Sequence, residues 1–429
     1  MVSLIINLLF FILISYPIIG AMCWFCGVLC YQFLYKSNSK RVPHRSISKN
    51  KNNAYPFISI IVPAHNEEVL IENTIDYLMN EIDYPNYEVI VADDGSTDNT
   101  PSVLKKMSEK YIAKNFRTLR VNSNKGKAHA LNIAAGFAKG EFILSNDADV
   151  LPESNALNRY MDYFFSRENS RVAAVTGNMS VRNRSSILGK SQTVEFSSIV
   201  GSIKRSQSAT IDTMYAYSGA NTMYRKSALI DVGMFRQDRA TEDISIAWDH
   251  SLNGWGTLFA PDIMFYMNVP ENLISLFHQR KRWAKGGIEV WLSNFIKVVK
   301  SPIKYFKQVI LLLDQTCSIV WSFSFFILFF FFCINMILFF INRNYVDIET
   351  TLLYTSIFIV FELFSGLIEV GVSLIFDDAS KKTKYIIFTP LYLLIFWIIN
   401  PLAIVVSLPG AIKTVLGNGI GTWASPKRN

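Results

Sequence analysis

Long apolar segments at the two ends of the chain constrain its fold more than any other feature. The first extends from Leu4 to about Leu34, and two others lie within Ile319–Ile341 and Leu352–Phe376. An α-helix needs about 20 apolar residues to cross a bilayer, and each of these segments is long enough. A fourth segment, Tyr385–Leu408, contains two prolines, so we expect it to be kinked or partly interfacial. The pattern predicts a multi-pass membrane protein.

The apolar segments leave a middle region of ordinary soluble composition. We therefore divide the chain into an N-terminal transmembrane helix (1–35), a basic juxtamembrane linker (36–55), a soluble domain (56–270), an amphipathic interfacial segment (271–308), a C-terminal transmembrane region (309–412) and a tail (413–429).

Basic residues predict the orientation of the chain in the cell membrane. Six of them follow the first helix with no acidic residue between them: Lys36, Lys40, Arg41, Arg45, Lys49 and Lys51. The loop after the second apolar segment carries Asp347 and Glu349, whereas three lysines follow the third (Lys381, Lys382 and Lys384). Loops rich in lysine and arginine stay in the cytoplasm, so we expect a cytoplasmic soluble domain. If all four segments span, the C-terminus lies outside.

The formal net charge of +8 does not indicate a nucleic-acid partner, because no RNA- or DNA-binding module signature is present. Lysines 297, 300, 304 and 307 are expected to meet the anionic lipid bilayer instead. All five cysteines lie in or beside apolar segments. Packing within membrane helices is favoured over a metal or redox site for them.

Strands and helices alternate in the first part of the soluble domain. Apolar, β-branched runs predict strands at Phe57–Val62, Tyr87–Ala92, Leu119–Val121 and Glu141–Ser145. Helical spacing predicts helices at Glu68–Asn80 and Ala128–Ala138, and Pro101 suits the first turn of another. This order predicts an α/β fold with a mostly parallel sheet.

Polar clusters follow the carboxyl ends of three predicted strands. They are Ala64-His65-Asn66-Glu67, Asp93-Asp94-Gly95 and Asn146-Asp147-Ala148-Asp149. Ligands of open α/β sheets bind at this edge, and neither a G-x-G-x-x-G nor a P-loop motif is present to hold phosphates. Asp147 and Asp149 can aim two carboxylates at one point, and such oxygen ligands suit Mg²⁺ or Mn²⁺. An Asp-rich turn is the structural alternative.

Four further motifs combine cations, acids and small residues. Lys125-Gly126-Lys127 opens a helix, where cationic side chains and free N–H groups favour phosphate. Thr241-Glu242-Asp243 places two acids together, and Gln279-Arg280-Lys281-Arg282-Trp283 joins fixed cations to an aromatic platform. Ser218-Gly219-Ala220 would let a ligand approach the backbone. The structural alternatives are that Asp243 is an acid stabilised at a helix N-terminus and that Trp283 anchors the chain at the membrane interface.

In series, these motifs resemble those of the family 2 glycosyltransferases of the GT-A fold. The resemblance rests on DDGSTDNT, GKAHALN, DAD, TED and QRKRW, and it covers Phe57 to Trp283. VRNRSSILGKSQTVEFSSIVGSIKRSQS and the closing TWASPKRN are similar to segments of bacterial poly-β-1,6-N-acetylglucosamine synthases, which make biofilm polysaccharide. The resemblance implies a processive hexosyltransferase with UDP-N-acetylglucosamine as donor, a growing polysaccharide as acceptor and a divalent cation. It also implies a small membrane accessory protein as partner.

The resemblance further implies a role for each matching residue. Catalysis falls to Asp243 as general base and to Arg280 and Arg282, which would neutralise the departing diphosphate. Nucleotide-sugar binding falls to Ala64, Glu67, Asp94, Lys127 and Asp147, and metal binding to Asp149 and Asp147. Acceptor binding falls to Glu242, Gln279, Trp283, Ser218 and Gly219. Asp93 departs from the Asn that close relatives often carry, but the second Asp of the motif is kept.

One base without a protein nucleophile predicts a single displacement with inversion, so an α-linked UDP-sugar would give a β-linked polymer. Several alternatives stay open from the residues alone. The site could belong to a glycosidase, to a non-processive transferase acting on a lipid carrier, or to an inactive scaffold of the same fold. Hyaluronan, chitin and cellulose synthases share the same motifs.

Two acidic residues lie inside the third apolar segment. Glu362 and Glu369 are seven residues apart and therefore share one helical face. Acidic residues within a membrane usually face protein or water and are functional candidates. We expect them to line a sugar passage or to pair with another helix.

Overall fold

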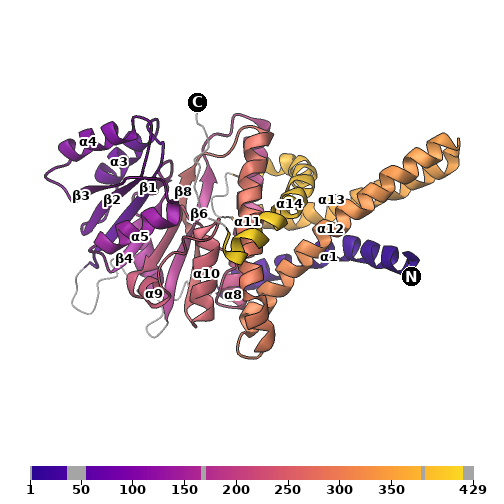
Figure 1. The fold of residues 1–429 in the computed structure, drawn as a ribbon, viewed down its shortest axis with the longest axis horizontal. Helices are drawn as coiled ribbons and strands as arrows, with labels where there is room; N and C mark the ends of the chain where they lie inside the picture. Colours follow the sequence, from indigo (N-terminus) through magenta and orange to yellow (C-terminus); the bar gives the residue numbers. More distant parts are fainter. Residues whose placement is uncertain (1, 36–54, 166–170, 378–381, 419–429) are drawn as a thin grey trace.

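The computed structural model describes residues 2–35, 55–165, 171–377 and 382–418. These residues form a soluble α/β domain with a set of long helices on one side of it (Figure 1). The predicted basic linker (36–54), Lys381 and most of the tail (419–429) lie outside the described residues. The cytoplasmic orientation inferred from the linker therefore stays a prediction.

The α/β domain is built on one eight-stranded sheet in the order β3-β2-β1-β4-β7-β6-β8-β5. The strands are β1 (Ile58–Ala64), β2 (Tyr87–Asp94), β3 (Phe116–Val121), β4 (Phe142–Asn146), β5 (Leu151–Pro152), β6 (Val172–Val181), β7 (Asn221–Arg225) and β8 (Gly256–Met267). Strands β3, β2, β1 and β4 are parallel, as are β6 and β8, whereas β7 is antiparallel to both neighbours and β5 to β8. The predicted fold class is confirmed, and the four predicted strands differ only at their ends.

Helices cover both faces of this sheet, which is why every residue of β1 is buried. Side chains alternate along a strand, so Ile60 and Ile61 enter different cores. Ile60 packs with α3 (Ile71–Asn80), α4 (Thr100–Lys110) and α6 (Ala156–Phe165). Ile61 packs with α5 (Lys127–Phe137), α9 (Lys226–Asp231) and α10 (Glu242–Leu252). The helices predicted near residues 68–80 and 128–138 are α3 and α5.

A layer of helices lies between the sheet domain and the membrane helices (Figure 1). It contains α7 (Ile187–Glu195), η2 (Phe196–Val200), α8 (Gly201–Thr210) and α11 (Leu273–Lys300). The sequence of α8 is polar, yet Lys204 and Arg205 are buried, because α8 lies between β8 and the first membrane helix. Gly27 of that helix lies directly against Ser206.

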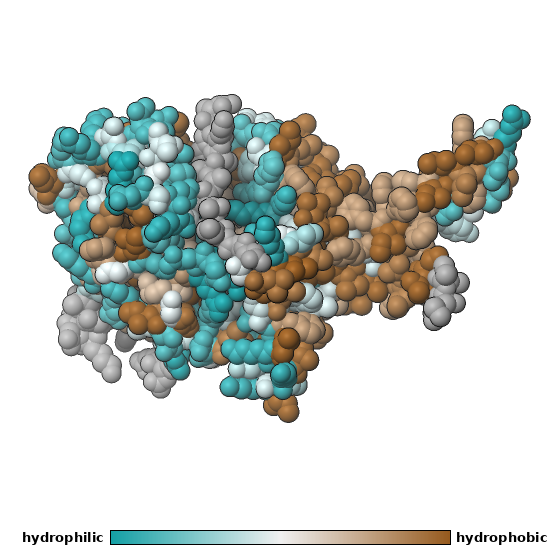
Figure 2. Space-filling view, viewed as in Figure 1, coloured by the Kyte–Doolittle hydropathy of each residue, from teal (hydrophilic) through white to brown (hydrophobic). Residues whose placement is uncertain are grey.

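Four helical segments in the described part of the chain are long and apolar enough to cross a membrane. They are built from α1 (Val2–Cys30) with η1 (Tyr31–Tyr35), α12 (Phe306–Ile341), α13 (Tyr345–Phe376), and α14 (Thr389–Lys413) between η3 (Thr383–Phe388) and η4 (Thr414–Asn418). Figure 2 shows a hydrophobic surface over this part and a largely hydrophilic one over the sheet domain. The chain is therefore a membrane protein.

Helix α14 contacts the α7–α11 layer near both of its ends. Tyr392 packs with Leu188 of α7 and Leu276 of α11. Near the other end, Ser407 Oγ donates to the carbonyl oxygen of Lys281 on α11 (2.9 Å). These contacts hold both ends of α14 against the α7–α11 layer. The expectation that this segment, if it spans, ends on the outer side of the membrane stays a prediction.

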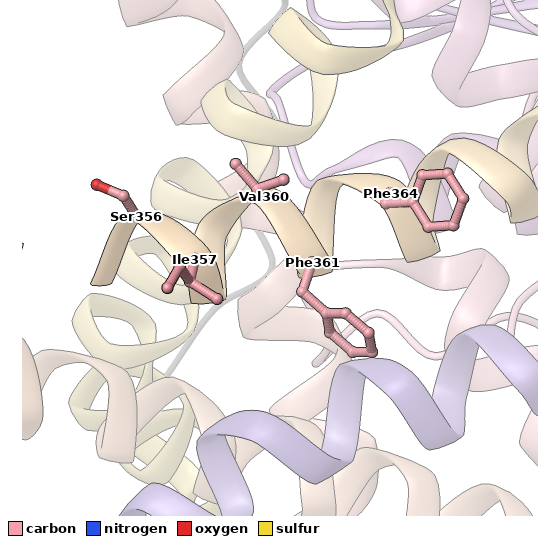
Figure 3. Close-up of a pocket in the computed structure, with 5 residues that line it drawn as sticks. All are labelled: Ser356, Ile357, Val360, Phe361 and Phe364. Atoms are coloured by element: carbon pink, nitrogen blue, oxygen red, sulfur yellow. The ribbon is translucent and has the colours of Figure 1, made fainter. Parts of the chain in front are cut away.

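A hollow of about 450 Å³ lies on the surface of α13 (Figure 3). Its lining residues all come from this one helix: Ser356, Ile357, Val360, Phe361 and Phe364. None of them carries a charge, so the hollow offers nothing to a nucleotide or a metal ion. The chemistry of this protein lies elsewhere, at the edge of the sheet.

Candidate active site

The polar clusters predicted from sequence meet at one edge of the sheet. Ala64 ends β1, Asp94 ends β2 and Asn146 ends β4, and these strands are parallel neighbours. Strand β7 begins at the same edge, where Asn221 pairs with Asn146. The turn before β7, which holds Gly219, therefore lies beside the turn that follows β4.

The buried Asp94 carboxylate holds the loop before α5. It accepts the backbone N–H groups of Lys125 (3.1 Å) and Gly126 (2.7 Å). His65 braces the same corner, since its Nδ1 lies 2.9 Å from the Asp94 carbonyl oxygen and its Nε2 lies 3.0 Å from Asn124 Nδ2. Asp94 thus shapes the loop that opens α5, where phosphate binding was predicted.

Ala64 and Glu67 lie in this corner as well. Ala64 is buried on β1 beside Asp93 of β2. The Glu67 backbone N–H donates to Thr100 Oγ1 (2.9 Å), which fixes the loop after β1 onto the start of α4. The structure therefore brings Ala64 and Glu67 together with Asp94. Their contact with a nucleotide stays a prediction.

Lys127 is the centre of an acidic cluster. Its Nζ lies 2.7 Å from Asp147 Oδ1 and 2.9 Å from Glu242 Oε1, and it donates to the Gly219 carbonyl oxygen (3.3 Å). Burial by itself lowers the pKa of Lys127, but Asp147 and Glu242 outweigh it and hold the pKa above its ordinary value. The lysine is therefore charged, and it links the D-x-D turn to the T-E-D motif.

A side chain at position 219 would displace the charged groups around it. A Cβ there would lie 2.7 Å from Glu242 Oε1 and 2.9 Å from Lys127 Nζ. The Gly219 N–H donates to Asp243 Oδ2 (3.0 Å), and its carbonyl oxygen accepts from Ser145 Oγ (2.7 Å). The backbone itself is thus part of the acidic cluster, as the run of small residues suggested.

Asp243 lies in the first turn of α10, and its pKa is raised to about 6. Burial is the main cause and Glu242 adds to it, whereas Lys127, Arg282 and the Gly219 N–H act in the opposite direction. A carboxyl group with this pKa is mostly ionised at neutral pH, yet it binds a proton more readily than an ordinary aspartate. These are the properties of a general base.

Asp147 and Asp149 lie half-buried on the turn after β4. Asn146 Nδ2 donates to the carbonyl oxygens of Asp147 (2.9 Å) and Val150 (2.9 Å), which fixes this turn. Among the described residues, no group of three or more His, Cys, Asp or Glu side chains could hold a metal ion. Two carboxylates still fit a hard divalent cation whose other ligands are phosphate oxygens and water. Such an ion would share Asp147 with Lys127.

The arginines of the Q-R-K-R-W motif occupy different surroundings on α11. Arg280 is buried, with its Nη2 2.7 Å from Glu195 Oε2 and its guanidinium 4.2 Å from the centre of the Trp283 ring. Burial raises the pKa of Glu195 to about 7, against the effect of Arg280. Arg282 is exposed, and its charge acts on Asp243. Arg280 therefore supports Trp283, and its predicted contact with a diphosphate stays a prediction.

The predicted acceptor residues form two groups joined by Met179. Gly219 and Glu242 belong to the acidic cluster, and Ser218 directly precedes Gly219, with its Oγ donating to Met179 Sδ (3.4 Å). Trp283 packs against the apolar cluster that contains Met179, and Gln279 is half-buried nearby on α11. Met179 thus links the Ser218–Gly219 turn to the apolar cluster against which Trp283 packs.

Glu195 was missed in the sequence. It lies on α7, 85 residues from Arg280, and no spacing rule connects the two. The sequence signal for burial of Glu195 was weak. This acid has an apolar residue on each side and no basic residue one helical turn away. Ser145 and His65 were included in predicted strands or clusters without a role.

The fold and this site define a glycosyltransferase of the GT-A class. The profile of Glycosyl transferase family 2 matches residues 59–233. A mannosyltransferase from Pyrobaculum calidifontis, solved with GDP-Man and Mn²⁺, aligns with a TM-score of 0.54 at 20% identity, covering 93% of this chain and 98% of that one. At this identity the likeness concerns the fold alone.

Curated relatives match almost the whole chain. It is 32% identical over 424 residues to a poly-beta-1,6-N-acetyl-D-glucosamine synthase of Staphylococcus epidermidis, covering 98% of each. It is 33% identical over 430 residues to the synthase of the same name from Staphylococcus aureus strain COL, covering 97% of each. The chain therefore belongs to glycosyltransferase family 2, within the family of these membrane-bound polysaccharide synthases.

Proposed function

We propose that this enzyme polymerises N-acetylglucosamine from UDP-N-acetylglucosamine into a β-1,6-linked polysaccharide at the cytoplasmic face of the cell membrane. The observation that carries the proposal is the position of Asp243. Asp243 accepts a hydrogen bond from the Gly219 N–H and is linked through Glu242 and Lys127 to the D-x-D turn, in a chain that matches the synthases over 98% of its length. This arrangement supports a reaction between donor and acceptor at this point.

On the donor side, Asp94, Ala64 and Glu67 form the corner that would hold uridine. Lys127 lies at the start of α5, where its charge and the free N–H groups of the helix favour phosphate. Asp147 and Asp149 would hold Mg²⁺ or Mn²⁺, which neutralises charge on the diphosphate when bound. The ion pair with Lys127 orients the Asp147 carboxylate towards the proposed metal position before the donor binds.

On the acceptor side, Trp283 would stack on the terminal sugar while Asp243 accepts a proton from its hydroxyl group. The hydroxyl oxygen forms a bond to the anomeric carbon as the bond from that carbon to the diphosphate breaks, and UDP leaves with the electron pair. Exposed Arg282 would meet the negative charge that develops on the leaving group. One displacement inverts the anomeric centre, so an α-linked donor gives a β-linkage.

The growing chain also needs a path past the membrane helices. A cavity of about 300 Å³ lies between α1, α12 and α14, and aromatic side chains such as Trp321 and Tyr392 line it together with Asn400. Such aromatic faces and polar groups suit a sugar chain. Neither Glu362 nor Glu369 is among the described residues that line it, so we assign the passage to this cavity and not to the glutamate face of α13.

A small membrane accessory protein remains part of the proposal. Helices α12 and α13 extend beyond the other membrane helices (Figure 1). Their exposed side chains include Phe330, Phe340, Tyr354 and Phe364. This hairpin offers an apolar surface that a partner helix or lipid would cover.

The donor is tested with membrane vesicles that hold the full-length chain and one radiolabelled sugar nucleotide at a time. The proposal expects polymer from UDP-N-acetylglucosamine that resists chitinase, and expects little from UDP-glucose or UDP-glucuronate. A product that chitinase digests would contradict the linkage. Polymer formed only from another sugar nucleotide would contradict the donor, and a single transferred sugar would contradict processivity.

A further inference from the structure

The segment before the catalytic aspartate contacts one face of α11 at three successive points. Arg239 Nη2 donates to Ser293 Oγ (3.0 Å), the Ala240 N–H donates to Glu289 Oε2 (2.8 Å), and the Thr241 side chain packs against Gly286. Positions 286, 289 and 293 are three and seven residues apart, so they share one helical face. Three consecutive residues are thus held by successive turns of the same helix. We call residues 286, 289 and 293 the docking strip.

Gly286 gives the closest of these contacts. A Cβ at this position would overlap Thr241 Oγ1 and lie 2.8 Å from Thr241 Cβ. Both residues are buried, so neither can move aside into solvent. Any residue larger than glycine would push the T-E-D motif away from α11.

Glu289 is fully buried, which is costly for a carboxylate unless it is paired or hydrogen-bonded. Its Oε2 accepts the Ala240 N–H, and its Oε1 lies 3.5 Å from Lys285 Nζ. The Ala240 N–H precedes the first turn of α10, so α10 itself provides no partner for it. Glu289 therefore ties the start of α10 to α11 through a bond that neither helix supplies alone.

Other parts of α11 are attached to different elements. Arg280 and Trp283 lie together near its beginning, and Trp291 Nε1 donates to Thr316 Oγ1 of α12 (2.9 Å). The helix thus joins the aromatic platform, the docking strip and a membrane helix in one rigid element. The sheet edge carries the donor groups, and it meets the T-E-D motif at the Lys127–Glu242 ion pair.

We propose that the docking strip positions the catalytic aspartate, so that α11 fixes Asp243 together with the Gly219 N–H at the sheet edge. Gly286, Glu289 and Ser293 act through the backbone of residues 239–241 and are positioning residues. The aromatic platform and the base are then attached to the same helix, whereas the Asp94 corner belongs to the sheet. The inference rests on the proposed role of Asp243 as general base.

The first test replaces Glu289 in the full-length chain in membranes. E289A removes the acceptor of the Ala240 N–H, and misplacing a catalytic group by about 1 Å lowers kcat by roughly 10- to 100-fold. The KM for UDP-N-acetylglucosamine should change less than kcat does, because the Asp94 corner and the D-x-D turn lie on the sheet and not on α11. E289Q keeps an oxygen that can accept the bond and should retain most of the activity. The control is N294A, whose side-chain amide donates to the Val290 carbonyl oxygen one turn back on α11 and takes no part in the docking strip.

A second pair of variants tests the close packing of Gly286 against Thr241. G286A should lower kcat, and adding T241A should restore part of it, because the second change removes the atoms that the new Cβ overlaps. Stabilisation by UDP in a thermal unfolding assay reports whether each variant is folded. If E289A is unfolded, the kcat values of E289Q, G286A and G286A/T241A test the positioning role of the docking strip instead.

A wild-type kcat in folded E289A and folded G286A would overturn the inference. So would a loss of kcat in G286A/T241A that equals the sum of the losses in G286A and T241A. An E289A defect confined to KM would also contradict it. Failure of the proposed function has a different signature. In that case D243N would polymerise as fast as the wild type, whatever the docking-strip variants do.

Discussion

Replacing Glu242 with glutamine should move the acid limb of the kcat/KM profile to lower pH. The pKa of Asp243 is raised from 3.8 to about 6, first by burial and then by Glu242. In the wild type, the ionised fraction of Asp243 falls from about nine-tenths at pH 7 to about one-tenth at pH 5, so kcat/KM should fall roughly tenfold.

Glutamine keeps the shape of Glu242 but removes its charge. Burial of Asp243 persists, so its pKa should stay above 3.8 but fall below that of the wild type, because the like charge of Glu242 is gone. Between pH 7 and pH 5, the variant should therefore lose a smaller fraction of its activity than the wild type does.

The assay measures UDP release from membranes at saturating metal ion between pH 4.5 and pH 8. Only the midpoint is compared, because E242Q also removes a partner of Lys127 and lowers the amplitude. The matched control is E109Q, an exposed acid on α4, which should keep the wild-type midpoint. An acid limb that E242Q leaves in place, or moves to higher pH, would refute the electrostatic reasoning.

Four other outcomes are expected. Gly219→Ala should lower kcat, measured by UDP release at equal protein level, by roughly 100-fold. The new Cβ of residue 219 would separate the Lys127 ammonium group from the carboxylates that pair with it. Glu195→Ala should cost about 3–5 kcal/mol of unfolding free energy in detergent by leaving Arg280 buried without a partner, and a double variant lacking both side chains should recover part of it. Asp243→Asn should abolish turnover. It should also raise the free energy of unfolding at pH 7 by up to about 3 kcal/mol, because the pKa of Asp243 is higher in the folded than in the unfolded chain. This gain in stability should shrink as the pH falls from 6 to 4. Chelation of divalent cations should stop UDP release, and Mg²⁺ or Mn²⁺ in excess should restore it.

The sheet and the edge of the site could be predicted because their signals are local. A run such as Ile58–Val62 is apolar and β-branched, and a polar cluster follows it directly. Parallel strands place such clusters side by side whatever the loops between them contain. The D-x-D turn and the Asp94 corner could therefore be placed without coordinates.

The contacts that give the site its charge balance could not be predicted in the same way. Lys127 meets Glu242 across 115 positions of sequence, and only the packing of β7 between β4 and β6 brings them together. Helix α8 has a polar sequence typical of an exposed helix, yet it is buried between the sheet domain and α1. Glu289 likewise resembles a solvated residue on an amphipathic helix until the Ala240 N–H is seen beside it.

If Asp243 is the base of a metal-dependent polymerising transferase, polymer formation must depend on its carboxylate. Wild-type and Asp243→Asn chains at equal amounts in membrane vesicles are compared for polymer formation from radiolabelled UDP-N-acetylglucosamine. We expect chitinase-resistant polymer from the wild type alone, with the variant still stabilised by UDP. Polymer from the variant at the wild-type rate would show that Asp243 is not the base.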